Sequence, residues 1–208
     1  MRTTIRINIL RPWMIAMFGL LLLAGQAMAE QKSARVAVEE STNLLLAKLI
    51  EIQPLYAEDP ELFFQQVESS LAPFIDFDGF SRGVMAKYYR RATDEQKSRF
   101  VKVFQDKMIR TYAKALLEFD NQRVEVVEST STESKRDRAA IDLIVHSNDG
   151  TVYTINYSMV LVDEQWMLRN ITIEGINIGL QFRSQFSAYM DKYGNRIDDV
   201  IDNWSVDV

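Results

Sequence analysis

The sequence contains no cysteine and a single histidine, His146. Without cysteine, the chain can form neither a disulfide framework nor a thiol-based catalytic site. One histidine alone builds neither a histidine-based metal site nor a Ser-His-Asp triad. Glycine-rich loops of the kind that cradle phosphates are missing as well. These absences exclude several common forms of catalysis, and the fold must be held together by packing alone.

Basic residues are fewer than acidic ones, 24 against 29, which gives a formal net charge of −5. Nucleic acid is a poor partner for such a chain, because its binding depends on neutralising phosphates. Two short basic runs lie at Arg90-Arg91 and at residues 135–138. Each is either solvated surface or a docking site for lipid head groups or for an acidic partner.

The carboxylates that gather in the sequence do not predict a metal site. Asp76 and Asp78 stand where helix capping favours acids, and residues 198–202 suit a solvated helix face. Neither group has the loop of spaced oxygen ligands with a central glycine that calcium requires. His146 should lie opposite the apolar side of its strand, which predicts a solvated or merely hydrogen-bonded side chain.

The first 29 residues have the pattern of a cleavable signal peptide. Three arginines precede an apolar run at residues 13–24, and Ala27-Met28-Ala29 matches a small-x-small cleavage site. The run is shorter than the roughly 20 residues that span a bilayer, and no cysteine offers a lipoprotein anchor. We therefore expect an exported, periplasmic protein of one domain, residues 30–208. Cleavage would lower the net charge to −8, since this segment contains three basic residues and no acidic one.

Helical spacing of apolar residues predicts helices before and after a central β region. Asp59-Pro60 should open the second helix, and Thr93 with Gln96 forms a capping box that starts the longest one. Gly83, inside the third helix, predicts close packing against another backbone. The predicted helices span residues 30–53, 60–72, 79–91, 94–119, 180–193 and 196–204.

The period of the pattern changes from 3.6 to 2 after residue 121. Strands are predicted at residues 123–129, 138–147, 151–162 and 166–174, with a polar turn at 131–136 and a hairpin at Asn148-Asp149-Gly150. Residues 176–178 read as a linker. We therefore predict an α+β domain in which helices cover one apolar face of a four-stranded antiparallel meander. Apolar faces of this kind normally fill one another as core, but the same residues can line a cavity.

Residues 75–117 form the densest run of patterned sequence, and further motifs lie in the β region and near the end of the chain. The motifs are Asp76-Phe77-Asp78, Ser81-Arg82, Val84-Met85, Tyr88-Tyr89-Arg90, Ala92-Thr93, Glu95-Gln96, Phe100, Thr111-Tyr112-Ala113, Ala115-Leu116, Tyr157, Ile173-Glu174-Gly175-Ile176 and Phe182-Arg183-Ser184-Gln185-Phe186. In these motifs the chain resembles the MlaC family of periplasmic phospholipid-binding proteins, also called toluene-tolerance or ABC-transport auxiliary proteins. Tyr89 and Asn177 depart from the family's common Trp and Ser.

The resemblance implies a carrier that moves phospholipid between membranes and helps to keep the outer membrane asymmetric. Its implied partners are phospholipid, an inner-membrane ABC transporter complex with its substrate-binding MCE component, and an outer-membrane lipoprotein/porin complex. No cofactor is expected, since the phospholipid is cargo. Acyl chains would lie in an apolar cavity, with the head group at the mouth. We predict that the cavity is lined by Val84, Tyr88, Phe104, Met108, Tyr112, Ile141, Leu143, Tyr153, Ile155, Tyr157, Met159, Leu161, Ile173 and Phe182.

Two other classes of function stay open at this point. A cone of helices over a curved sheet can hold a proton-transfer site, for which Asp142 and Tyr153 are the candidate residues. The alternation of the strand, however, places Asp142 away from the apolar face. The other class is an interaction module, such as a chaperone for exported proteins, with no pocket or one that takes peptide.

Overall fold

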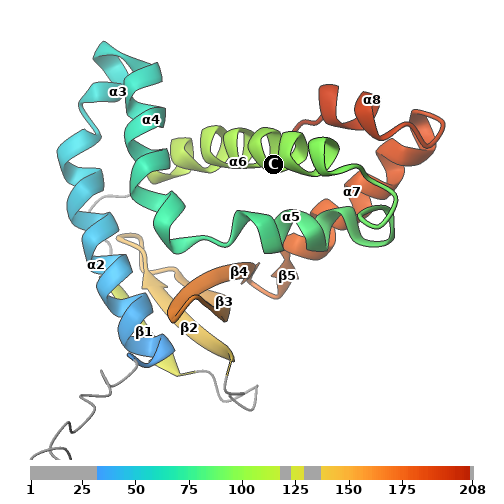
Figure 1. The fold of residues 1–208 in the computed structure, drawn as a ribbon. Helices are drawn as coiled ribbons and strands as arrows, with labels where there is room; N and C mark the ends of the chain where they lie inside the picture. Colours follow the sequence, from blue (N-terminus) through green and yellow to red (C-terminus); the bar gives the residue numbers. More distant parts are fainter. Residues whose placement is uncertain (1–31, 118–122, 129–136, 207–208) are drawn as a thin grey trace, which may run out of the picture. The chain divides into compact units, whose positions relative to one another are not determined.

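The computed structural model describes residues 32–117, 123–128 and 137–206, which belong to one compact unit, Lys32–Val208 (Figure 1). Helices come first along the chain, an antiparallel sheet follows, and two helices close it. The α+β class predicted from the sequence is therefore confirmed. The predicted signal peptide at residues 1–29 and the polar turn at 131–136 lie outside the described residues.

The helices before the sheet begin where their capping residues predict. Asp59 accepts a hydrogen bond from the Leu62 amide at 3.0 Å and caps α4. Thr93 and Gln96 form the predicted capping box, with bonds of 3.0 and 3.1 Å. The elements are α2 (Ala34–Ile52), α3 (Leu55–Glu58), α4 (Pro60–Leu71), the 3₁₀ turn η1 (Ala72–Phe74), α5 (Phe77–Met85), the 3₁₀ turn η2 (Ala86–Tyr88) and α6 (Asp94–Leu116).

The third predicted helix is shorter than the prediction of residues 79–91. It ends at Met85 because Ala86 adopts a φ of 48°, a left-handed conformation that an α-helix cannot continue through. The prediction for Gly83 is also wrong, because a Cβ built there would meet no atom within 4 Å. The close approach lies instead at Gly79, four residues earlier on the same helix.

Within the described residues, the sheet has five antiparallel strands in sequential order, rather than the predicted four. The strands are β1 (Arg123–Glu128), β2 (Arg138–His146), β3 (Val152–Val162), β4 (Gln165–Ile173) and the short β5 (Ile176–Asn177), which occupies the predicted linker. Across the centre, Ile141 pairs with Tyr157 and Leu143 with Ile155. These pairs lie on one face of the sheet, because side chains alternate along a strand. The two closing helices are α7 (Ile178–Lys192) and α8 (Ile197–Asp202).

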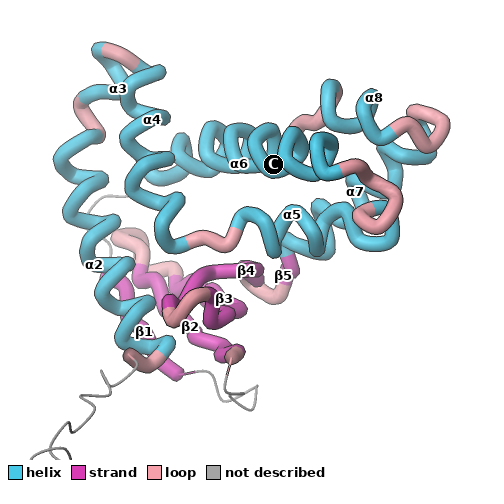
Figure 2. The backbone as a smooth tube through the Cα atoms, in the orientation of Figure 1, coloured by secondary structure: helices cyan, strands magenta, loops and turns pink. Residues whose placement is uncertain are grey.

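The buried apolar residues form two separate clusters. The helical core is built from the second half of α2 and from α4 to α8. It surrounds Phe100, Phe104, Phe186 and Trp204, whose rings lie between 5.0 and 6.3 Å from their neighbours. The sheet cluster joins Ala34 and Val38 of α2 to Ile141, Leu143 and Met159. Figure 2 shows the corresponding division between the helices and the strands, with α2 extending from α4 to the sheet.

A β-bulge alters the register between the two strands at the centre of the sheet. Ser158 pairs with Asn170, whereas the next residue, Met159, pairs with Leu168. Arg169 is therefore an extra residue on β4. Because of this insertion, an even-numbered residue before Arg169, such as Leu168, and an odd-numbered residue after it, such as Ile171, lie on the same face of the sheet.

The bulge also attaches two helices to the sheet. The Nε of Arg169 donates to the Asp76 carboxylate at 2.6 Å, and Asp76 caps α5 by accepting from the Gly79 amide at 2.8 Å. The next residue, Asn170, donates to the side chain of Asn177 at 3.0 Å, and Asn177 caps α7. Two consecutive residues of β4 thus hold the N-termini of α5 and α7.

This junction predicts opposite effects for two glycine substitutions in the same helix. A Cβ at Gly79 would overlap the side chains of Asp76 and Arg169, so Gly79→Ala is expected to lower the free energy of unfolding by about 1–3 kcal/mol. Gly83→Ala is expected to raise it by up to about 1 kcal/mol, because the site is open and helical. Urea unfolding measures both, and equal effects at the two positions would contradict the assigned junction.

Candidate functional site

A narrow apolar slot lies where α2 crosses the inner face of the sheet. Its walls come from α2, from the end of α4 with the turn that follows, and from β3 and β4. No charged side chain lines it among the described residues. The lining residues are Val38, Ser41, Thr42, Leu45, Leu71, Phe74, Ile75, Tyr157, Met159, Trp166 and Leu168.

The local structure of each wall explains why these residues share the slot. On α2 the lining residues fall at positions 38, 41, 42 and 45, the spacing of one helix face. On β3, Tyr157 and Met159 are alternate residues and point the same way. On β4, Trp166 and Leu168 pair with Leu161 and Met159, a register that the bulge at Arg169 creates.

The slot lies at the boundary between the two apolar clusters. The first half of α2 contributes Ala34 and Val38 to the sheet cluster, and its second half contributes Leu49 and Ile52 to the helical core. The slot-lining residues 41, 42 and 45 lie between these halves. The cavity volume is about 60 Å³. One water molecule occupies ~30 Å³ in the liquid, so the slot is far smaller than an acyl chain. Widening the slot by moving α2 outward separates Ala34 and Val38 from the strands of the sheet cluster, and the helical core is not split.

Two tyrosines have raised pKa values, Tyr157 in the slot and Tyr112 against the helical core. Burial raises the pKa of the Tyr157 hydroxyl above its usual value, and burial also raises the pKa of Tyr112 on α6. An unperturbed tyrosine has a pKa of about 10, so both rings are neutral at physiological pH. Tyr157 therefore adds no charge to the slot, which stays suited to an apolar ligand.

The structure divides the fourteen residues predicted to line a cavity into several groups. Two of them, Tyr157 and Met159, line the slot. Ile141, Leu143 and Ile155 belong to the same sheet cluster. Val84, Tyr88, Phe104 and Phe182 are buried in the helical core, and Met108, Tyr112 and Ile173 pack against that core. Tyr153 is 42% exposed, and Leu161 belongs to neither cluster. Contact between lipid and any of these residues stays a prediction.

Most of the slot residues were not among those predicted from the sequence. They come from α2, from the turn after α4 and from β4. The helical spacing of Val38 and Leu45 was available as a signal, but Ser41 and Thr42 between them are polar, and nothing in the pattern indicates that this face meets a sheet. The pairing of β4 with β3 depends on the bulge, which the sequence pattern did not reveal.

The two residues considered for a proton-transfer site are not brought together. Asp142 accepts a hydrogen bond from Asn156 at 2.6 Å, on the face of the sheet opposite Ile141 and Leu143. Tyr153 lies near the end of β3, where it pairs with Val145 and is exposed. His146 lies 3.4 Å from the Glu125 carboxylate at the sheet edge and is also partly exposed.

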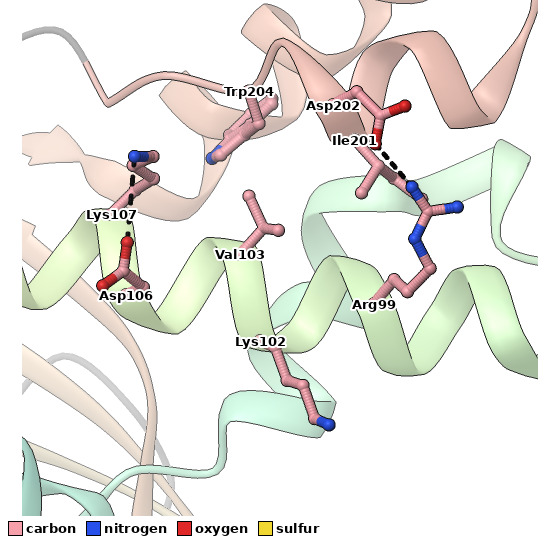
Figure 3. A pocket seen from close by; sticks show the side chains of 8 residues that line it. All are labelled: Arg99, Lys102, Val103, Asp106, Lys107, Ile201, Asp202 and Trp204. Carbon is pink, nitrogen blue, oxygen red and sulfur yellow. Dashed lines mark hydrogen bonds and ion pairs between the residues drawn. The ribbon is translucent and has the colours of Figure 1, made fainter.

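A wider depression of about 560 Å³ lies between α6 and α8 (Figure 3). Ion pairs cross or border it, including Lys107 with Asp106 and Arg99 with Asp202. Charged groups are costly to remove from water, so this surface is unsuited to an acyl chain despite its larger volume. Its lining residues are Arg99, Lys102, Val103, Asp106, Lys107, Ile201, Asp202 and Trp204.

Membrane-spanning helices and metal-binding clusters are both absent from the described residues. In residues 32–117, 123–128 and 137–206, no helix has the length and apolar character needed to cross a membrane. The same ranges contain no group of three or more His, Asp or Glu side chains placed to hold a metal ion.

Comparison with known proteins gives a consistent set of relatives. Residues 39–206 match the family model described as MlaC protein. The chain is 35% identical over 196 residues to the toluene tolerance protein ttg2D of Pseudomonas putida, covering 94% of this chain and 87% of that protein. It is 26% identical over 105 residues to the intermembrane phospholipid transport system binding protein MlaC of Haemophilus influenzae, covering 50% of this chain and 49% of the relative.

A solved structure has the same fold. It is the phospholipid-binding protein from Ralstonia solanacearum, determined in complex with a phospholipid. The TM-score is 0.74 at 23% sequence identity, and the match covers 82% of this chain and 94% of the other. At this level of identity the likeness establishes the arrangement of helices and strands.

Proposed function

The chain belongs to the MlaC family, and from this premise we propose that it is a phospholipid-binding transport protein. More specifically, it carries phospholipid through the periplasm between an outer-membrane lipoprotein/porin complex and an inner-membrane ABC transporter complex with its MCE component. This transfer maintains the lipid asymmetry of the outer membrane. The acyl chains enter the slot between α2 and the sheet, and the charged head group stays in solvent.

The observation that carries this proposal is the slot itself, whose described lining is free of charged side chains. Each methylene moved from water to an apolar site contributes roughly 0.8 kcal/mol. Two acyl chains with about 15 methylenes each thus represent on the order of 24 kcal/mol of transfer free energy. A carrier retains such a ligand in water only if its site is nearly as apolar as the bilayer. The slot, whose polar lining consists of the hydroxyl-bearing Ser41, Thr42 and Tyr157, comes nearer to that requirement than the charged depression between α6 and α8 does.

Binding requires α2 to move away from the sheet. Pockets for drug-sized ligands span about 300–1,000 Å³, whereas the slot measures about 60 Å³. The start of α2 is attached to the sheet by a 2.9 Å hydrogen bond from the Trp166 indole to the carbonyl of Lys32. Its far end packs in the helical core through Leu49 and Ile52. When α2 rotates outward about this far end, its first half moves away from the sheet. This movement widens the slot and leaves the helical core intact.

Lipid analysis of the purified protein tests this proposal. The chain is purified without detergent from a Gram-negative host and extracted with organic solvent, and the extract is quantified by mass spectrometry. We expect stoichiometric phospholipid, released on denaturation. The lipid-loaded protein should also unfold at a higher temperature than the delipidated protein, because a ligand that binds only the native state stabilises it. A lipid-free sample that also fails to acquire phospholipid from vesicles would contradict the proposal.

A further inference from the structure

A group of basic side chains lies at one end of the helical core. Although the chain is acidic overall, these side chains have no carboxylate partner among the described residues. The segment from Arg82 to Arg91 contains four basic residues and no acidic one, although the whole chain has a net charge of −5. None of the four forms an ion pair with a carboxylate of the described residues, and neither does Arg183 on the adjoining helix α7. We call Arg82, Lys87, Arg90, Arg91 and Arg183 the cationic patch.

Aromatic rings hold most of these cations in place. The guanidinium of Arg82 lies 5.0 Å from the centroid of the Tyr89 ring. Lys87 and Arg91 lie 4.9 and 5.4 Å from the centroid of the Tyr88 ring. Such contacts are attractive because the face of an aromatic ring is electron-rich. The charges of Arg82, Lys87 and Arg91 are therefore positioned before any partner arrives.

The Tyr88 ring is itself fixed by α7. It is buried, its hydroxyl lies 3.3 Å from the Ser187 hydroxyl, and its centroid is 5.8 Å from that of Phe186. Arg183 is exposed and precedes Ser187 by one helical turn, so it lies on the flank of α7 that meets Tyr88. The patch thus spans α5, the turn after it and α7, which pack together.

Nearby carboxylates do not neutralise the patch. Asp78 precedes Arg82 by one turn of α5, yet the two form no ion pair, because Arg82 lies over Tyr89 instead. Asp94 pairs with Lys97 at 2.9 Å. Glu95 and the α7 residue Asp191 are exposed. Against these acids, the five cations leave a local excess of positive charge.

From this arrangement we propose that the cationic patch docks on a carboxylate-rich surface of a partner protein. The inference rests on the proposed carrier function, which requires the chain to recognise membrane complexes. Four of the five cations are arginines, whose planar fork matches a carboxylate with two parallel hydrogen bonds. Fixed cations lose little conformational entropy on binding, which favours recognition of a defined pattern of acids.

The position of the patch suits docking that leaves the slot free. The slot reaches Ile75, just before α5, whereas the patch lies toward and beyond the far end of that helix. Nine residues of α-helix span roughly 13 Å. In Figure 1, α2 is at the left and the connection from α5 to α6 is at the right. A partner seated on the patch therefore holds the carrier without covering α2.

An anionic membrane surface fits the patch less well. Attraction to anionic lipid is nonspecific and needs no fixed fork geometry, and peripheral helices usually add large apolar side chains that enter the interface. Within the described residues, no large exposed apolar side chain lies between Arg82 and Arg91, and Leu180, three positions before Arg183 on α7, is one such side chain on the patch's helices. We therefore assign the patch to a protein partner and include vesicles in the test.

The test uses the mature chain and the two membrane complexes of the same organism, each purified and captured on a biosensor. The patch variant is Arg90→Glu with Arg183→Glu. The matched control is Arg35→Glu with Lys114→Glu, two exposed cations outside the patch that also form no ion pair with described carboxylates. We expect the patch variant to bind at least one complex on the order of tenfold to a hundredfold more weakly. The control should stay within about twofold, and added salt should weaken wild-type binding.

Three outcomes would overturn the proposal. In the first, the wild type binds neither complex in a salt-dependent way, and in the second, the patch variant binds as the wild type does. In the third, the patch variant loses binding only to vesicles of phosphatidylglycerol and phosphatidylcholine, which identifies a membrane surface as the ligand. Lipid content is measured in parallel. A wild type that binds through the patch but contains no lipid refutes the carrier function and leaves the docking surface intact.

Discussion

Leu45→Glu is expected to remove phospholipid from the protein, whereas Leu44→Glu is expected to leave it bound. The two residues are neighbours on α2, but Leu45 lines the slot and Leu44 is 61% exposed on the outer side. A carboxylate among acyl chains has no partner in the slot, and burying an unpaired charge costs several kcal/mol. We expect at least a roughly tenfold loss of lipid per chain for Leu45→Glu. Mass spectrometry of solvent extracts measures it.

The comparison between these two variants controls for the added charge and for its effect on the helix. Circular dichroism and urea unfolding establish that both variants are folded before their lipid content is compared. If folded Leu45→Glu retained the wild-type amount of phospholipid, the slot would not be the binding site. If both variants lost lipid equally, net charge rather than position would be responsible.

Phe104→Ala is expected to produce the largest loss of stability, about 3–5 kcal/mol. Phe104 is fully buried, and its ring centroid lies 5.2 Å from that of Phe80 and 5.4 Å from that of Phe182. Native domains are stable by only about 5–15 kcal/mol, so the substitution removes a large part of the total. Urea unfolding at equilibrium measures the change.

A second substitution at this position tests whether Phe104 belongs to the core or to the lipid site. The milder Phe104→Leu keeps the protein folded and should leave the phospholipid content per folded chain unchanged. A loss of lipid without a loss of stability would instead place Phe104 against the acyl chains, as the sequence pattern had suggested.

Local signals in the sequence were sufficient to locate the principal helices and strands. The caps at Asp59 and Thr93 and the turn at Asn148-Asp149-Gly150 involve residues only a few positions apart, so their chemistry is visible in the sequence. The end of α5 was missed because Ala86, which lacks the conformational freedom of glycine, takes a positive φ there. Helix breaks of this kind are imposed by tertiary packing and have no local signal.

The junction between helices and sheet depends on distant residues and was therefore not predicted. Arg169 and Asp76 are 93 positions apart, and their contact exists only because β4 has a bulge. The mistaken role for Gly83 has the same origin. Both it and Gly79 are helical glycines, and the crowded site is distinguished by the side chains of Asp76 and Arg169, which are held together over Gly79.

The candidate site was predicted in part. Strand alternation placed Tyr157 and Met159 on the inner face of the sheet, where they line the slot. The aromatic stripe of α6 was assigned to the same cavity, because periodicity gives an identical pattern for a packed core and a lipid-lined wall. The structure separates them: Phe104 packs among other rings, and α2 supplies the wall that faces the sheet.

The most direct test of the lipid slot is photo-crosslinking with a phospholipid that has a diazirine near the end of one acyl chain. The protein is loaded with this lipid, irradiated, digested and mapped by mass spectrometry. We expect adducts on α2 between residues 38 and 45 and on β3 and β4 between residues 157 and 168. Adducts confined to α6 and α8, around Phe104 or Trp204, would contradict the slot and place the acyl chains in the helical core.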